Sequence, residues 1–216
     1  MMSLRLHVFP PSPRAFKVMA AANHLGLAWE LRLVHLFQGD QDQPAYIALN
    51  PNRRMPTLWD DGFVLWEANA ILQYLAAKAP AGGLGPASVR EQAEINRWQF
   101  WDLAHWEPAV SVLLNENLKK PLVMGQAPDP EEVAKGEAAF QVCAAILEAH
   151  LAEHAFVACD RLTVADFSLG AFLNHNAGYP LAPYPALRRW LEALQRLPAW
   201  RDTRAQCLPN SAATAA

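Results

Sequence analysis

The chain lacks several features that define whole classes of protein. Its three cysteines are scattered at Cys143, Cys159 and Cys207, which fits reduced thiols rather than a disulfide framework. No Cys/His spacing resembles a zinc site, so we expect no metal. No apolar run approaches the ~18 residues that a membrane span needs, and the N-terminus lacks a signal peptide's apolar core and cleavage site. We therefore expect a cytoplasmic protein that is not associated with a membrane.

Charge is also scarce. Charged residues make up 18% of the 216 residues, the net charge is −3, and there is no basic run. Because a nucleic-acid surface requires clustered lysine and arginine, we expect no nucleic-acid partner. Hydrophobic residues make up 52%, which is enough for a sizeable core and too many for a disordered chain. This length allows one large domain or two small ones.

The first part of the chain alternates strand and helix patterns. The predicted elements are a strand at 4–9, a helix at 16–25, a strand at 27–36, a short helical piece at 46–49, strands at 57–59 and 63–66, and a helix from 67. Asp61-Gly62 is a hairpin turn signal between the last two strands. The order is βαβ followed by ββα, as in thioredoxin-like folds, with the first two strands parallel.

The rest of the chain is predicted to be helical. A Gly- and Pro-rich linker at 79–87 precedes helices over 88–118, 131–154, 164–173, 185–196 and 198–205, with a proline-containing loop at 119–130 and a frayed tail at 209–216. Thr163 and Asp166 form a capping box at the start of an apolar, buried helix. The predicted fold class is therefore α/β plus all-α. A thioredoxin-like domain at 1–78 and a linker at 79–87 are followed by a C-terminal helical bundle at 88–216.

The ordered combination of Pro56, Glu67 and the Thr163–Asp166 capping box resembles the cytosolic glutathione S-transferase superfamily, over about residues 3–205. The chain is similar to its serine-type, bacterial-like members. The resemblance implies a homodimeric transferase that ionises the thiol of glutathione, its co-substrate, and adds it to a small hydrophobic electrophile in detoxification. Two alternatives stay open. One is a glutathione-dependent disulfide or peroxide reductase, and the other is a non-catalytic binding module with the same fold.

Ser12 is the predicted catalytic residue. It lies between the first strand and the first helix, so its hydroxyl can sit at a helix N-terminus, where an anion is best accommodated. The alternative is a helix-cap or turn serine. The resemblance, which includes Lys17-Val18 five residues on, implies that the hydroxyl donates to the glutathione sulfur. No cysteine lies within residues 1–80, and neither Tyr46 nor Tyr74 is near the end of the first strand, which disfavours the cysteine and tyrosine types.

The resemblance also implies that Met55, Pro56, Glu67 and Ala68 bind glutathione. The Met55 backbone would pair with the cysteinyl part, which in the family requires a cis peptide bond before Pro56. Glu67 and its neighbour would hold the γ-glutamyl end; the alternative for Glu67 is an acid favoured in the first turn of a helix. Ala68 stands where the family usually has Ser or Thr, so a side-chain contact is lost there.

Arg53 and Arg54 immediately precede Met55. The resemblance implies that one of them pairs with the glycine carboxylate of glutathione, and arginine suits a carboxylate because it binds bidentately. Two adjacent arginines in a loop are otherwise solvated. The residues themselves do not distinguish Arg53 from Arg54.

Trp101, His105 and Trp106 are the predicted second-substrate pocket. Positions 98, 101 and 105 share one face of the first helix of the second domain. This face would supply a hydrophobic wall for the electrophile, which His105 would polarise. The alternative is core packing and dimer contact, with His105 as a hydrogen-bonded helix histidine.

Overall fold

The computed structural model describes residues 4–207, so the predicted frayed tail lies outside the described residues. Contacts divide the chain into two compact units. The first consists of the chain up to Gly85 together with the segment that begins at Leu197, and the second spans Pro86–Arg196. These units differ from the predicted domains in where the last helix belongs. Within residues 4–207 no helix is long and apolar enough to cross a membrane, and no three His, Cys, Asp or Glu side chains gather in a metal-binding group.

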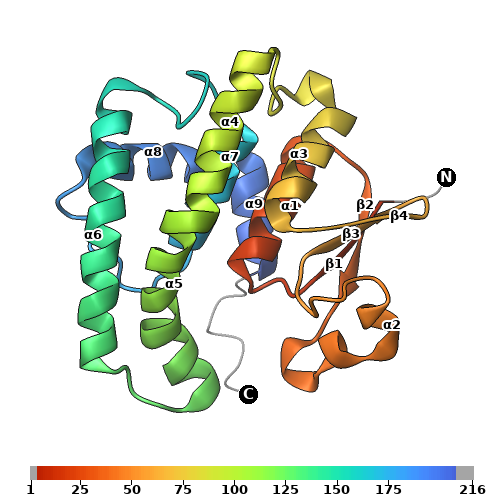
Figure 1. Ribbon diagram of the computed structural model, residues 1–216, viewed down its shortest axis with the longest axis horizontal. Coiled ribbons are helices and arrows are strands. Elements are labelled where there is room, and N and C mark those ends of the chain that lie inside the picture. The colour runs from red at the N-terminus through yellow and green to blue at the C-terminus, as the bar shows by residue number, and fades with distance from the viewer. Residues whose placement is uncertain (1–3, 208–216) are drawn as a thin grey trace. The chain divides into compact units, whose positions relative to one another are not determined.

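A four-stranded sheet with the order β2-β1-β3-β4 is the base of the first unit (Figure 1). Its strands are β1 (Leu4–Val8), β2 (Trp29–Leu33), β3 (Thr57–Asp60) and β4 (Phe63–Trp66). β1 pairs with β2 in parallel and with β3 antiparallel, and β3 and β4 form an antiparallel hairpin. Asp61 (φ 50°) and Gly62 (φ 88°) are both left-handed, as a tight hairpin turn requires. The predicted thioredoxin-like order is thus confirmed.

Helices from both ends of the chain complete this unit. They are α1 (Pro13–His24), α2 (Pro44–Ile47), α3 (Ala68–Lys78) and α9 (Pro198–Cys207), with short 3-10 turns η1 (Leu36–Gln38), η2 (Asp40–Asp42) and η3 (Pro80–Gly82). α9 packs on α1: the Phe16 and Trp200 ring centroids are 4.8 Å apart, and Asn23 Nδ2 donates to Thr203 Oγ1 at 2.8 Å. α1 begins earlier than predicted because Pro13 takes the first helical position, where its missing N–H is no loss.

The second unit is helical throughout. Its elements are α4 (Val89–Trp101), η4 (Asp102–Trp106), α5 (Glu107–Leu114), η5 (Asn115–Met124), α6 (Pro130–Glu153), α7 (Val164–Leu173) and α8 (Pro185–Arg196). The predicted loop at 119–130 is wrong over 119–124, where η5 continues as a π-helix. Glu116 holds this turn by accepting from Lys120 Nζ at 2.6 Å and from the Asp129 amide at 2.9 Å. Pro121 lies inside this π-helix, although it has no amide hydrogen to donate to the helix.

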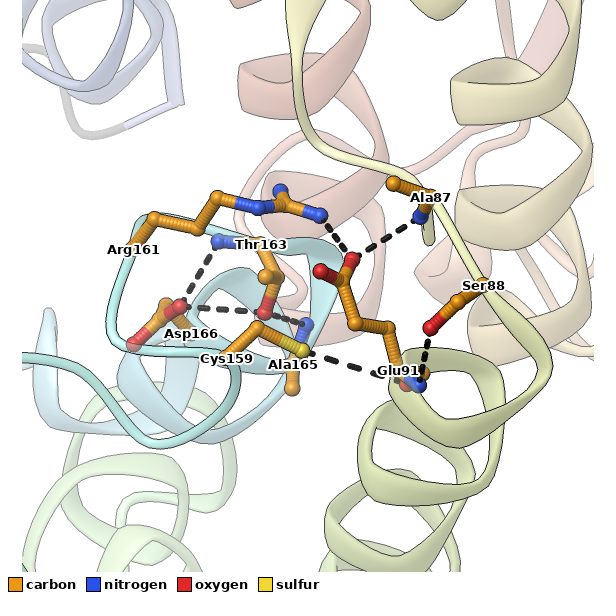
Figure 2. A network of polar contacts seen from close by, with 8 residues as sticks. All are labelled: Ala87, Ser88, Glu91, Cys159, Arg161, Thr163, Ala165 and Asp166. Carbon is orange, nitrogen blue, oxygen red and sulfur yellow. Dashed lines mark hydrogen bonds and ion pairs between the residues drawn. The ribbon is translucent and has the colours of Figure 1, made fainter.

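The predicted capping box at the start of α7 is confirmed (Figure 2). Asp166 is fully buried and accepts from the Thr163 amide at 2.8 Å, the Val157 amide at 3.0 Å and Trp190 Nε1 at 2.9 Å. Burial raises the pKa of Asp166 to about 6, against the opposing effect of these donors. The carboxylate therefore joins the segment before α7 to α8 as well as capping its own helix.

The start of α4 is held by a second polar network in Figure 2. Ser88 Oγ accepts from the Glu91 amide at 3.2 Å, which makes Ser88 a working N-cap. Glu91 Oε2 in turn accepts from the Ala87 amide at 2.8 Å and from Arg161 Nη2 at 2.5 Å. The N-terminus of α4 is thereby attached to the loop that precedes α7.

Candidate functional site

Three loops of the first unit leave the sheet at the same end of its strands, where β1 and β4 end and β3 begins. In the strand register His7 lies opposite Thr57, and Thr57 lies opposite Trp66, so these residues form one row across β1, β3 and β4. Ser12 follows the end of β1, Pro56 precedes Thr57, and Glu67 follows Trp66. Because neighbouring strands are ~4.8 Å apart, the register brings the predicted glutathione residues of three separate segments together.

Ser12 is the N-cap residue of α1, but its side chain does not cap the helix. It is half-buried, has extended backbone angles (φ −73°, ψ 131°), and its amide donates to the Phe9 carbonyl at 2.9 Å. Its hydroxyl accepts no hydrogen bond from the amides of α1, a helix that the structure describes in full. The geometry therefore does not favour the interpretation of Ser12 as a side-chain helix cap. Its hydroxyl lies at the N-terminal, positive end of the helix dipole.

The Met55-Pro56 peptide bond is cis, as expected from the family. The Met55 side chain is buried in a small apolar cluster with Val34 and Tyr46, against which Phe9 and Leu36 also pack. The side chain of Met55 is thus an anchor, while its backbone belongs to the loop at the sheet edge. Phe9 brings the segment before Ser12 onto the same cluster.

A polar network that sequence reasoning missed surrounds this cis bond. The Tyr46 hydroxyl and Asn50 Nδ2 each donate to the Arg54 carbonyl at 2.7 Å. Thr57 Oγ1 lies 3.0 Å from the Tyr46 hydroxyl oxygen and accepts from Asn50 Nδ2 at 3.1 Å. All three side chains are buried. Their sequence patterns predict only a short helix, a turn and a strand, because the pattern of each segment does not reveal its partners.

Glu67 has a backbone conformation that non-glycine residues rarely adopt. It is the N-cap residue of α3 with φ 73° and ψ 113°, is exposed, and forms no side-chain bond to the amides of that fully described helix. Such backbone angles cost about 1–3 kcal/mol and cluster at ligand sites. Glu67 precedes the first turn of α3, so it is not an ordinary first-turn acid. Ala68, the first residue of α3, is buried, and its amide is among those left without a partner within the helix.

The two candidate arginines have different environments. Arg53 Nη1 lies 3.4 Å from Asp42 Oδ1, and both side chains are exposed. Within residues 4–207 no ion pair is formed by the Arg54 guanidinium, although its carbonyl is held by Tyr46 and Asn50. Arg54 thus has a fixed backbone and a charged group that remains available to a carboxylate.

The three predicted second-substrate residues have different environments. Trp106 is fully buried and its Nε1 donates to the Leu169 carbonyl at 2.9 Å, which favours the core-packing interpretation for this residue. Trp101 is half-buried and stacks on Trp106, with ring centroids 6.1 Å apart. His105 is exposed, with its ring centroid 6.3 Å from that of Trp101. Of the three, Trp101 and His105 present accessible surface.

The thioredoxin-like unit, the cis-proline loop and the capping box in the helical unit together define a glutathione-transferase type of fold. The sequence pattern of the glutathione S-transferase N-terminal domain matches residues 2–77, and that of the C-terminal domain matches residues 130–193. The chain is 34% identical over 210 residues to glutathione S-transferase 3 of Zea mays, which covers 94% of each chain. The chain belongs to the glutathione S-transferase family.

Two further proteins extend the similarity. Glutathione S-transferase D7 of Drosophila melanogaster is 31% identical over 94% of this chain and 89% of its own length. The theta class enzyme of Xanthomonas axonopodis pv. citri, whose crystal structure has glutathione bound, is 29% identical with a TM-score of 0.86 and covers 94% of this chain and 97% of its own. These comparisons confirm the predicted superfamily, fold and class of enzyme.

Proposed function

We propose that the chain is a serine-type glutathione transferase in which Ser12 activates the thiol of glutathione. The observation that carries this proposal is the position of Ser12, at the N-cap of α1 with a hydroxyl that the helix does not use. The hydroxyl donates to the glutathione sulfur and stabilises the thiolate, which is the nucleophile. The thiol proton leaves to solvent water, and the thiolate forms a carbon–sulfur bond to a small hydrophobic electrophile, which in an aryl halide breaks the carbon–halogen bond and releases halide.

The magnitudes are sufficient for this step. A free thiol titrates near ~8.5. A hydrogen bond to a charged acceptor contributes ~1.5–3 kcal/mol, and a helix N-terminus adds ~0.3–2 kcal/mol. At ~1.36 kcal/mol per pKa unit, these effects lower the pKa of the bound thiol by roughly 1–4 units. The thiolate is then the major species near neutral pH.

The remaining contacts hold the peptide. The Met55 backbone beside Pro56 pairs with the cysteinyl part, while Glu67 and the Ala68 amide bind the γ-glutamyl end. We propose Trp101 and His105 as the wall that holds the electrophile, with Trp106 supporting Trp101 from the core. The three cysteines are free thiols in the described chain, which fits the proposed detoxifying role in the cytoplasm.

Binding and turnover together test this function. We expect retention on immobilised glutathione, a thermal shift with glutathione, and conjugation of an aryl halide. Turnover of disulfides or hydroperoxides alone would instead identify a reductase, and binding without any turnover would identify a non-catalytic module. Failure to bind glutathione would refute the proposal.

Arg54, rather than Arg53, is proposed to meet the glycine carboxylate, because Arg53 already pairs with Asp42. We expect Arg54→Ala to raise the Kd for glutathione by about 1.5- to 5-fold, since exposed ion pairs contribute ~0.2–1 kcal/mol. Arg53→Ala is the matched control and should change Kd less. Calorimetric titration of both variants measures the difference, and a larger effect at Arg53 would contradict the assignment.

We also propose a homodimer. Large apolar side chains are exposed on α4, η4 and α6, at Phe100 (64%), Leu103 (42%), Val142 (66%) and Ile146 (48%). η4 and α6 are in contact, since Cys143 Sγ donates to the His105 carbonyl at 3.7 Å. Exposed apolar surface of this kind marks an interaction site, and two-fold dimers are the commonest oligomers.

The substitution Val142→Glu is expected to convert the dimer to a monomer, because it places a charge within this surface. Light scattering at micromolar concentration measures the mass. Val89→Glu is the control: Val89 is 88% exposed at the start of α4, where a carboxylate is favourable, so this variant should remain dimeric. A monomeric wild-type protein would contradict the proposed dimer.

A further inference from the structure

Tyr46 belongs both to the apolar cluster and to the polar network beside the cis-proline loop. Its ring packs with Val34 and Met55. Its hydroxyl contacts the Arg54 carbonyl at 2.7 Å and Thr57 Oγ1 at 3.0 Å. One side chain thus contacts the residue before Met55, the side chain of Met55 itself, and the residue after Pro56.

The hydrogen atoms of this network can be assigned without conflict. A carbonyl only accepts, so the Tyr46 hydroxyl donates to Arg54, and the Thr57 hydroxyl then donates to the Tyr46 oxygen. Asn50 uses its two Nδ2 hydrogens on the Arg54 carbonyl and on Thr57 Oγ1. Asn50 Oδ1 accepts from the Asn52 amide at 3.0 Å, which ties the network to the preceding turn. Burial raises the pKa of Tyr46, so its hydroxyl keeps its proton at neutral pH.

These contacts hold the cis-proline loop on both sides of Met55-Pro56. The carbonyl of Arg54 and the side chain of Thr57 flank Met55-Pro56, and the Met55 side chain is held in the cluster. The cluster also includes Phe9, whose carbonyl accepts from the Ser12 amide at 2.9 Å. The Tyr46 ring therefore supports the Ser12 segment, while its hydroxyl supports the Met55 segment.

We propose that Tyr46 is a positioning residue that holds the Met55 backbone in the geometry that binds the cysteinyl part of glutathione. This inference rests on the proposed function. The backbone contacts of Met55 are made before and during the reaction alike, so their loss weakens binding without slowing the chemical step. Tyr46 thus affects the KM for glutathione, whereas Ser12 affects kcat.

The test compares Tyr46→Phe with Tyr74→Phe. Both variants lose one tyrosine hydroxyl from the same unit. Tyr74 lies on α3, away from the Met55-Pro56 loop, and its hydroxyl donates to Asp60 Oδ2 at 2.6 Å. We expect Tyr46→Phe to raise the Kd and KM for glutathione by about 3- to 10-fold, with kcat at saturating glutathione changed by less than about twofold. Tyr74→Phe should lower the melting temperature and leave both constants unchanged. Calorimetry and steady-state conjugation of an aryl halide supply the readouts.

Thr57 provides an independent pair of variants should Tyr46→Phe not fold. Thr57→Val removes the hydroxyl and should raise the KM for glutathione. Thr57→Ser keeps the hydroxyl and should have the KM of wild type. If wild type binds glutathione but Tyr46→Phe and Thr57→Val match Tyr74→Phe in Kd, the positioning role is overturned and the proposed function stands. An effect on kcat at unchanged KM would also overturn it. A wild-type protein that does not bind glutathione would overturn both.

Discussion

Turnover should fall by about 10- to 100-fold when Ser12 is replaced by alanine, because the bond to the glutathione thiolate contributes ~1.5–3 kcal/mol. The pKa of the bound thiol should rise by roughly 1–2 units. The affinity for glutathione should change less, since Met55, Glu67 and Arg54 hold the peptide. The thiolate absorbance of the complex against pH measures the pKa directly. Activity of the variant should still increase with pH over the range where wild-type activity has become constant.

Ser88→Ala is the matched control for this experiment. Ser88 is also an N-cap serine, but its hydroxyl accepts from the Glu91 amide at 3.2 Å, whereas that of Ser12 caps no amide of the described α1. Ser88→Ala should lower the free energy of unfolding by ~0.5–2 kcal/mol and leave the thiolate pKa unchanged. Ser12→Ala should raise the thiolate pKa and leave the free energy of unfolding nearly unchanged. If wild type and Ser12→Ala titrate alike and turn over equally, Ser12 is a turn residue and a backbone amide of the 10–15 loop holds the sulfur.

The second large effect is expected at Asp166. Asp166→Ala should lower the free energy of unfolding by about 3–5 kcal/mol, since it leaves buried donors of Val157, Thr163 and Trp190 without an acceptor. For a chain of this length the loss corresponds to a fall in melting temperature of roughly 6–20 °C. Measurement at pH 7.5 keeps the carboxylate ionised, because that pH lies above the pKa of about 6 to which burial raises Asp166.

Asp129→Ala separates the buried network from ordinary capping. Asp129 is the exposed N-cap of α6 and accepts from the Glu131 amide at 2.9 Å. Its replacement should lower the free energy of unfolding by only ~0.5–2 kcal/mol. Equal losses at Asp129 and Asp166 would show that the buried Asp166 carboxylate stabilises the fold no more than an ordinary helix cap does. Both variants should keep the thiolate pKa of the wild-type complex if the soluble protein remains folded.

Local signals in the sequence predicted much of the fold. The Asp61-Gly62 turn and the Thr163–Asp166 box act over two to four residues, so the amino acids themselves indicate the geometry. The pairing of β1 with β3 then brings the segments of Ser12 and Pro56 together, whereas the sequence patterns predict only the order of these elements. What could not be predicted depends on distant partners: Pro121 indicates a loop, yet η5 persists there because of contacts with other segments.

The positioning role of Tyr46 was hidden for the same physical reason. Its hydroxyl partners, Arg54 and Thr57, lie 8 and 11 residues along the chain, beyond the reach of helical or strand periodicity. A tyrosine in a short helix predicts packing, whereas the destination of its hydroxyl is decided by how the loop returns to the sheet. Conversely, Trp106 is predicted at a pocket because the sequence does not show whether a tryptophan in a helix is buried or accessible.

The attachment of α9 to α1 has a consequence for biosynthesis. Phe16 and Asn23 on α1 receive their partners Trp200 and Thr203 from a segment about 180 residues later. Domains usually fold from the N-terminus as the chain leaves the ribosome, at ~5–20 residues per second. Here the sheet-containing unit cannot complete its core until α9 is made, so the part of α1 that packs on α9 stays uncovered for roughly 10–40 s. This interval is when a nascent chain is most exposed to aggregation and to chaperone binding.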